Sequence, residues 1–119
     1  MQPLAPKPLL HAEGLAVLIG AILVYRHLHA SWALFALLFL APDLFMLGYV
    51  FGAKTGAVLY NLGHTYLAPI LVLALAWLIP CPWLLPAAVI WAAHIGFDRL
   101  LGYGLKYGDG FKSTHLARV

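Results

Sequence analysis

Four ionisable residues stand in the apolar stretches of this sequence, where such side chains are costly and are usually retained for a function. They are Asp43, His64, His94 and Asp98. Two imidazoles and two carboxylates are a ligand set that suits a divalent transition metal, such as Zn or Mn. With two histidines and one aspartate as ligands, a coordination position stays open for a water that the metal activates. The pattern therefore predicts a metal site capable of hydrolysis.

A second carboxylate near such a metal would act as the general base of a hydrolytic reaction. Asp43 is the first candidate, because it is spare if Asp98 binds the metal. Glu13 is the other candidate, although its place near the start of the first apolar run also suits an interfacial residue without a role. We expect the catalytic carboxylate to be one of these two, and we expect no organic cofactor.

Three more polar residues are expected to support this pocket. Asn61 and Thr65 lie on the same face of a helix as His64, at spacings of three and one residues along the chain. Arg99 follows Asp98 directly. It is either a snorkelling residue at the membrane boundary or a ligand for phosphate.

The sequence also allows an interpretation without a metal. His64 and His94, hydrogen-bonded to the aspartates, would hold neighbouring helices together inside lipid. A His-x-x-x-Asp spacing is common on helices, and the chain has no tight motif of the His-Glu-x-x-His type. Both interpretations require side chains from separate helices to meet at one depth.

The composition places these residues in a membrane protein. Of 119 residues, 64% are hydrophobic and 9% are charged, and the mean hydropathy is +0.92. Such a chain cannot cover a soluble globule with polar side chains, and it is too apolar to be disordered. Positions 55–97 contain no Asp, Glu, Lys or Arg. This length is enough for two membrane-spanning helices of about 20 residues each.

A proline-containing turn at residues 80–82 separates these two helices, and two more apolar runs precede them. We therefore expect an all-α fold, with residues 1–119 forming one domain, a four-helix transmembrane bundle. The helices are expected over roughly 9–25, 32–51, 56–79 and 83–101, followed by a short polar C-terminal cap over 102–119. At about 1.5 Å per residue, the four candidate ligands lie about 5–12 Å below one membrane boundary. Because the helices alternate in direction, these ligands should meet in one layer.

The basic residues predict the orientation of the bundle. Most of them fall on the side that carries both termini: Lys7, Lys54, Lys106, Lys112 and Arg118. Cytoplasmic loops carry an excess of Lys and Arg, so both termini are expected in the cytoplasm. A basic cytoplasmic face suits anionic lipid headgroups as partners. Nothing in this charge pattern indicates nucleic-acid binding.

Small residues form two ridges on the predicted helices. One ridge is Ala12, Ala16 and Gly20, and the other is Ala88, Ala92 and Gly96. Ridges with small residues at every fourth position let helices approach closely. They are expected to serve packing within the bundle or a contact in a homodimer.

Several motifs spread along the chain are distinctive. They are Ala41-Pro42-Asp43-Leu44 and the segments YNLGHTY at 60–66, HIGFDR at 94–99 and GYGLKY at 102–107. Together they resemble a family of small four-helix bacterial membrane proteins known as domain of unknown function four-two-six-zero. This resemblance implies the fold and a location in the bacterial inner membrane. It implies no activity.

A weaker likeness connects the chain with membrane-bound metal-dependent hydrolases. Those proteins have a Pro-Asp pair at the end of one helix and a His-rich Thr-His-Ser signature at the start of the next. Pro42-Asp43 and His64-Thr65 occupy similar places, whereas the second aspartate and the paired histidines of that family are absent here. The likeness implies metal-dependent hydrolysis.

Three classes of function remain open from the sequence. The first is a metal-dependent hydrolase that acts on a lipid or amphiphile at the inner leaflet. The second is a proton- or ion-coupled carrier subunit with the buried carboxylates as a relay, although residues 70–77 offer it no polar side chain in the outer half. The third is a structural or binding protein whose polar layer only sets helix packing.

Overall fold

The computed structural model describes residues 6–102 and residue 105, and the described chain is helical without any β-strand. Its elements are α1 (Pro6–His27), α2 (Trp32–Phe39), the 3-10 helix η1 (Ala41–Phe51), α3 (Ala53–His64), α4 (Leu67–Leu78) and α5 (Leu84–Leu101). The predicted all-α fold is thereby confirmed. The polar cap expected over 102–119 lies outside the described residues, except for Gly102 and Leu105.

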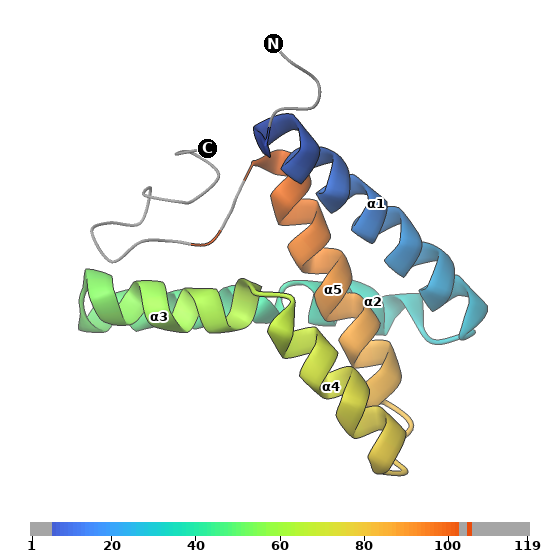
Figure 1. The fold of residues 1–119 in the computed structure, drawn as a ribbon. Helices are drawn as coiled ribbons and strands as arrows, with labels where there is room; N and C mark the ends of the chain where they lie inside the picture. The colour runs from blue at the N-terminus through green and yellow to red at the C-terminus, as the bar shows by residue number, and fades with distance from the viewer. Residues whose placement is uncertain (1–5, 103–104, 106–119) are drawn as a thin grey trace.

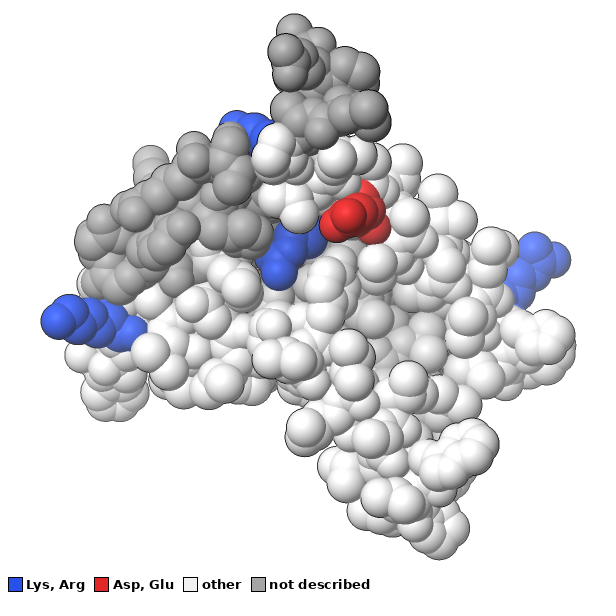
Figure 2. Space-filling view, viewed as in Figure 1, with Lys and Arg blue, Asp and Glu red and all other residues white. Residues whose placement is uncertain are grey.

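Three segments are long and apolar enough to cross a membrane: Pro6–His27, Trp32–Phe51 and Leu84–Leu101. Helices α3 and α4 pass the same test only as a pair, and they meet at a bend of 46°. The described chain thus has three candidate spans, or four if the bent pair is one span. On the face shown in Figure 2, most of the described surface is uncharged, and the charged side chains form isolated patches.

Proline explains the break between α3 and α4. Where the sequence predicts one helix over 56–79, α3 ends at His64, Thr65 is extended, and α4 begins at Leu67. Pro69 has no N–H to donate to the carbonyl of Thr65. The chain therefore starts a new helix with the proline in its first turn, where no N–H is needed.

Pro42 has a similar effect on the second expected helix, over 32–51. Helix α2 ends at Phe39, and the backbone continues from Ala41 as the tighter η1. The N–H of Asp43 donates to the carbonyl of Leu40, three residues back, as a 3-10 helix requires. This change of winding sets the direction in which the side chain of Asp43 leaves the helix.

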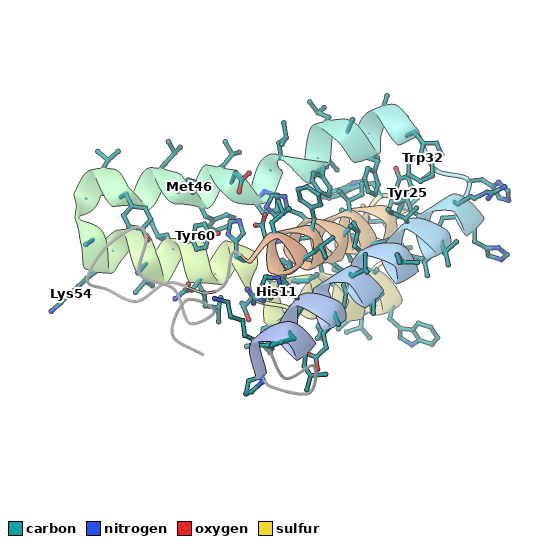
Figure 3. All side chains as sticks on the ribbon, turned by 90° about the horizontal axis from the view of Figure 1, so that it is seen from above. His11, Tyr25, Trp32, Met46, Lys54 and Tyr60 are labelled. Carbon is teal, nitrogen blue, oxygen red and sulfur yellow. The ribbon has the colours of Figure 1, made fainter. Side chains whose placement is uncertain are left out.

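The helices do not run side by side along their whole length, as the expected bundle would. Helix α5 packs antiparallel to α1 on one side and to α4 on the other (Figure 1). The segments η1 and α3 form an antiparallel hairpin that extends away from this group, with Lys54 at its tip (Figure 3). The bend after α3 turns the hairpin aside from α4. The base of the hairpin meets α5.

Helices α1 and α5 approach closely at Gly14 and Gly96. A Cβ atom at Gly14 would lie 2.5 Å from the Cβ of Arg99 and 2.7 Å from the carbonyl oxygen of Gly96. The small-residue ridge predicted along α1 is not this contact, because Ala12 and Ala16 are exposed. The buried face of α1 instead carries Gly14, Ala21 and Tyr25, so the contacting row is rotated around the helix from the predicted one.

Gly14→Ala is expected to lower the free energy of unfolding by roughly 1–3 kcal/mol, because the added methyl overpacks a backbone contact. Gly20→Ala is the matched control, since nothing lies within 4 Å of a Cβ at that position. There, alanine should be neutral or stabilise by up to about 1 kcal/mol through its helix propensity. Thermal unfolding of both variants in one detergent measures the difference. Equal melting temperatures would contradict the close contact.

Candidate metal centre

Asp43, His64, His94 and Asp98 come together at the base of the η1–α3 hairpin. One ligand atom from each residue lies within 4.8 Å of the other three. Asp43 is in the first turn of η1, His64 is the last residue of α3, and His94 and Asp98 are one turn apart on α5. The structure therefore joins side chains from three separate elements, as the sequence analysis expected.

The separations between the ligand atoms match a coordination shell. The Nε2 atom of His64 lies 3.1 Å from Oδ1 of Asp43, 3.1 Å from Nε2 of His94 and 3.4 Å from Oδ2 of Asp98. The Nε2 atom of His94 lies 3.2 Å from the same two carboxylate oxygens. Four ligands placed tetrahedrally at about 2.0–2.1 Å from zinc are about 3.3 Å apart. These five separations are close to that value, and the sixth, between the two carboxylates, is at most 4.8 Å.

The second nitrogen of His64 identifies the atom that can bind a metal. Its Nδ1 lies 2.9 Å from the carbonyl oxygen of Tyr60. A carbonyl only accepts hydrogen bonds, so Nδ1 carries the hydrogen, and Nε2 of the neutral ring has a lone pair. This lone pair faces the carboxylate oxygens of Asp43 and Asp98, and the negative atoms repel unless a cation or a proton lies between them. Metal-binding histidines usually donate their other N–H in this way.

Two donors from α5 hold the C-terminal end of α3 in place. Trp91 Nε1 donates to the carbonyl of Gly63 at 2.6 Å, and Arg99 Nη2 donates to the carbonyl of His64 at 3.3 Å. The last carbonyls of a helix have no partner inside the helix, so these bonds satisfy groups that otherwise need water. They fix the position of His64 against α5.

Tyr60 is a supporting residue that the sequence analysis missed. Besides accepting from His64, it stacks its ring on the imidazole, with 3.9 Å between ring centroids and 7° between planes. The spacing of four residues on one helix is the signal that could have indicated this contact. Tyr60 therefore limits rotation of the His64 ring from two directions.

The four candidate ligands differ in solvent exposure: three side chains are mostly buried, and that of Asp43 is partly exposed. The side chains of His64 and His94 are 1% and 3% exposed, and that of Asp98 is 15% exposed. The Asp43 side chain is 44% exposed. The Nδ1 atom of His94 is buried and makes no hydrogen bond of normal geometry within the described chain, although the Phe39 backbone lies beside it. The site is thus open on the Asp43 side.

The other predicted site residues lie at different distances from this centre. Glu13 is exposed on α1 and is not among the four clustered residues. The next residue, Gly14, is the one that faces α5, so Glu13 lies off the face of α1 that contacts α5. Thr65 caps the turn after α3, where its hydroxyl accepts from the N–H of Leu67 at 3.5 Å. Asn61 is half-buried on α3. Arg99 supports the centre through the main chain of His64.

Comparison with protein families matches residues 7–119 to the family described as Domain of unknown function (DUF4260). The chain belongs to this family. The stronger resemblance noted from the sequence motifs is therefore confirmed. No curated protein and no solved structure matches the chain. The weaker likeness to membrane-bound metal-dependent hydrolases has no support in these comparisons. The cluster of Asp43, His64, His94 and Asp98 is therefore the main indication of what this DUF4260 protein does.

Proposed function

We propose that this chain is a membrane metalloprotein that binds one zinc ion between Asp43, His64, His94 and Asp98. Five of the six ligand-atom separations are 3.1–3.4 Å, and these carry the proposal because they are close to the separations around a tetrahedral metal. Zinc is favoured over manganese, since manganese prefers more ligands, mostly oxygens, in an octahedron.

The arrangement also supports a more specific role as a hydrolase. His64, His94 and Asp98 would hold the metal from the buried side. The half-exposed Asp43 would either complete the ligand set or accept a proton from an incoming water. A metal held in this way supplies an activated water and polarises the bond to be cleaved. Asp43 is then the general base, as the sequence analysis expected of either Asp43 or Glu13.

An apolar groove beside Asp43 supports a lipid or other amphiphile as the substrate. It has a volume of about 330 Å³ and lies between η1 and α5. Its lining includes Pro42, Leu44 and Phe45 from η1, Ala87 and Trp91 from α5, and Trp83, which directly precedes α5. An acyl chain in this groove would bring its head end to the open side of the metal centre.

Both termini would face the cytoplasm of a bacterial inner membrane, because the basic residues concentrate on that side.

A structural role is the alternative that the same contacts favour. A protonated His64 would donate to Asp43 across the 3.1 Å separation, and protons would then take the place of a metal. Elemental analysis of detergent-purified protein, from cells supplied with zinc and manganese, distinguishes the two. We expect about one zinc per chain. Less than about 0.1 metal per chain at saturating supply would overturn the metal site and favour the structural role.

A further inference from the structure

Arg99 is a buried cation that forms no ion pair with a carboxylate of the described chain, although Asp98, the residue before it, lies near enough to interact with its charge. The residue is 8% exposed, and the ion pairs among described residues join only the two histidines to Asp43 and Asp98. The guanidinium donates one N–H to the carbonyl of His64. A guanidinium has five N–H groups that can donate. A buried charge costs several kcal/mol unless it is paired. A bound anion would accept hydrogen bonds from the remaining N–H groups and neutralise the buried charge.

Tyr66 provides a second unsatisfied group at the same place. Its hydroxyl is buried and has no hydrogen-bond partner among the described residues. The guanidinium carbon of Arg99 lies 5.6 Å from the centroid of the Tyr66 ring. A buried hydroxyl without a partner destabilises the folded state. A ligand that accepts from both side chains would remove both costs.

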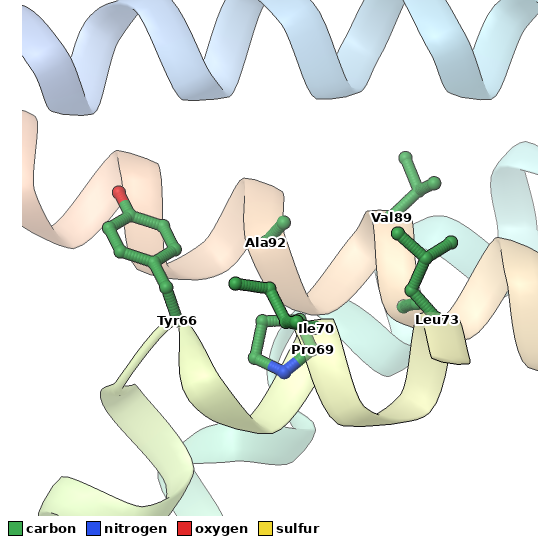
Figure 4. A pocket seen from close by; sticks show the side chains of 7 residues that line it. Tyr66, Pro69, Ile70, Leu73, Val89 and Ala92 are labelled. Carbon is green, nitrogen blue, oxygen red and sulfur yellow. The ribbon is translucent and has the colours of Figure 1, made fainter. Parts of the chain in front are cut away.

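An apolar groove begins at Tyr66 and runs between α4 and α5 (Figure 4). Its volume is about 210 Å³, and it is lined further by Pro69, Ile70, Leu73, Ala88, Val89 and Ala92. This lining has almost no polar surface. Helix α5 qualifies as a membrane span by itself, and α4 qualifies together with α3. The groove therefore suits an acyl chain, with the polar head at the Tyr66 end.

We propose that Arg99, Tyr66 and the α4–α5 groove bind one anionic phospholipid. Its phosphate accepts from the guanidinium fork and from the Tyr66 hydroxyl, and one acyl chain lies in the groove. Charge-assisted hydrogen bonds from arginine to phosphate are among the strongest in proteins. Glu13, exposed on α1, adds a negative charge near Tyr66 but forms no ion pair with Arg99 in the described chain.

This lipid site goes beyond the metal centre and does not depend on it. Arg99 donates a hydrogen bond to the main-chain carbonyl of His64 and interacts with the charge of Asp98, but it is not one of the four candidate ligands. Tyr66 lines the groove between α4 and α5. The zinc content of each variant therefore reports on the metal proposal separately from lipid binding.

Native mass spectrometry and thermal shift of the full chain in a non-ionic detergent test the proposal. Phosphatidylglycerol is the probe, with phosphatidylcholine and inorganic phosphate as comparisons. We expect one phosphatidylglycerol per chain, bound about tenfold more tightly than phosphatidylcholine, and no stabilisation by inorganic phosphate. Equal binding of the two lipids, or equal stabilisation by inorganic phosphate, would overturn the site.

Tyr66→Phe is the decisive variant, because it deletes a hydroxyl that pairs with nothing in the described chain. Without a lipid contact this change should leave affinity unaltered and the melting temperature equal or higher. With the contact, we expect phosphatidylglycerol to bind about tenfold more weakly while zinc content is unchanged.

Arg99→Gln should remove the preference for the anionic lipid, and Arg26→Gln, exposed at the end of α1, is its control. Arg99→Gln also loses the bond to His64, so Ala92→Phe serves as a variant that fills the groove and leaves that bond in place. Unchanged phosphatidylglycerol binding in both Tyr66→Phe and Ala92→Phe would disprove the proposal.

Discussion

Replacing His64 or His94 by alanine is expected to lower zinc from about one ion per chain to less than about 0.1. Each imidazole supplies one of four ligand atoms, and each Nε2 lies within 3.4 Å of the other three ligands. Alanine leaves two carboxylates and one imidazole around a space that water then enters. Elemental analysis of the purified variants, prepared beside the wild type, measures the loss.

His27→Ala is the control for these variants, because His27 is exposed at the end of α1. It should retain the zinc content of the wild type. A purely structural cluster gives a different result: both buried variants would lose thermal stability, and neither would differ from the wild type in metal. Full zinc content in both His64→Ala and His94→Ala would exclude these residues as ligands.

Removing the metal from the wild type with a chelator at neutral pH should lower the free energy of unfolding by roughly 4 kcal/mol. A ligand present at about 1,000 times its Kd, and bound only by the folded state, stabilises by about that amount. The expected fall in melting temperature is on the order of 10 °C. The effect should be large because η1 and α3 make few other close approaches to α5. Without the metal, the hairpin keeps the hydrogen bonds from Trp91 and Arg99 but loses the link between Asp43 and α5.

The response should be reversible and specific for the metal. Added zinc should restore the melting temperature, whereas magnesium should not, because magnesium prefers six oxygen ligands, several of them water. His64→Ala should not respond to the chelator. A wild-type melting temperature that stays constant after elemental analysis shows complete removal of zinc would contradict a stabilising role for the metal.

The η1–α3 hairpin brings together two of the four residues of the candidate metal centre. Asp43 and His64 are 21 residues apart, but the antiparallel pairing of η1 with α3 brings both to the same end. The turn that contains Lys54 lies at the other end (Figure 3). The open side at Asp43 therefore depends on where the two segments break, at Leu40 and Thr65. If the helices continued through Leu40 and Thr65, the side chains of Asp43 and His64 would point in other directions.

Local properties of the chain were sufficient to predict its class and the members of the cluster. Runs of apolar residues without charge identify candidate spans, because the cost of burying a charge in lipid depends on each residue alone. The four-residue spacing of His94 and Asp98 places both on one face of a helix, because that spacing is close to one turn. For these reasons, the sequence predicted that Asp43, His64, His94 and Asp98 would meet.

Tertiary structure decided the features that depend on side-chain direction. The sequence did not predict that Tyr60 accepts from Nδ1 of His64, or that Arg99 and Tyr66 pair beside a groove. The first arrangement lies within α3, where Tyr60 and His64 are four residues apart, whereas the second follows from the extended backbone of Thr65, which turns Tyr66 away from the direction of α3. A single pair of backbone torsion angles at such a break redirects everything after it. Pro69 causes the break, whereas the contacts of His64 and Tyr66 with α5 show how the two helices are directed on either side of it.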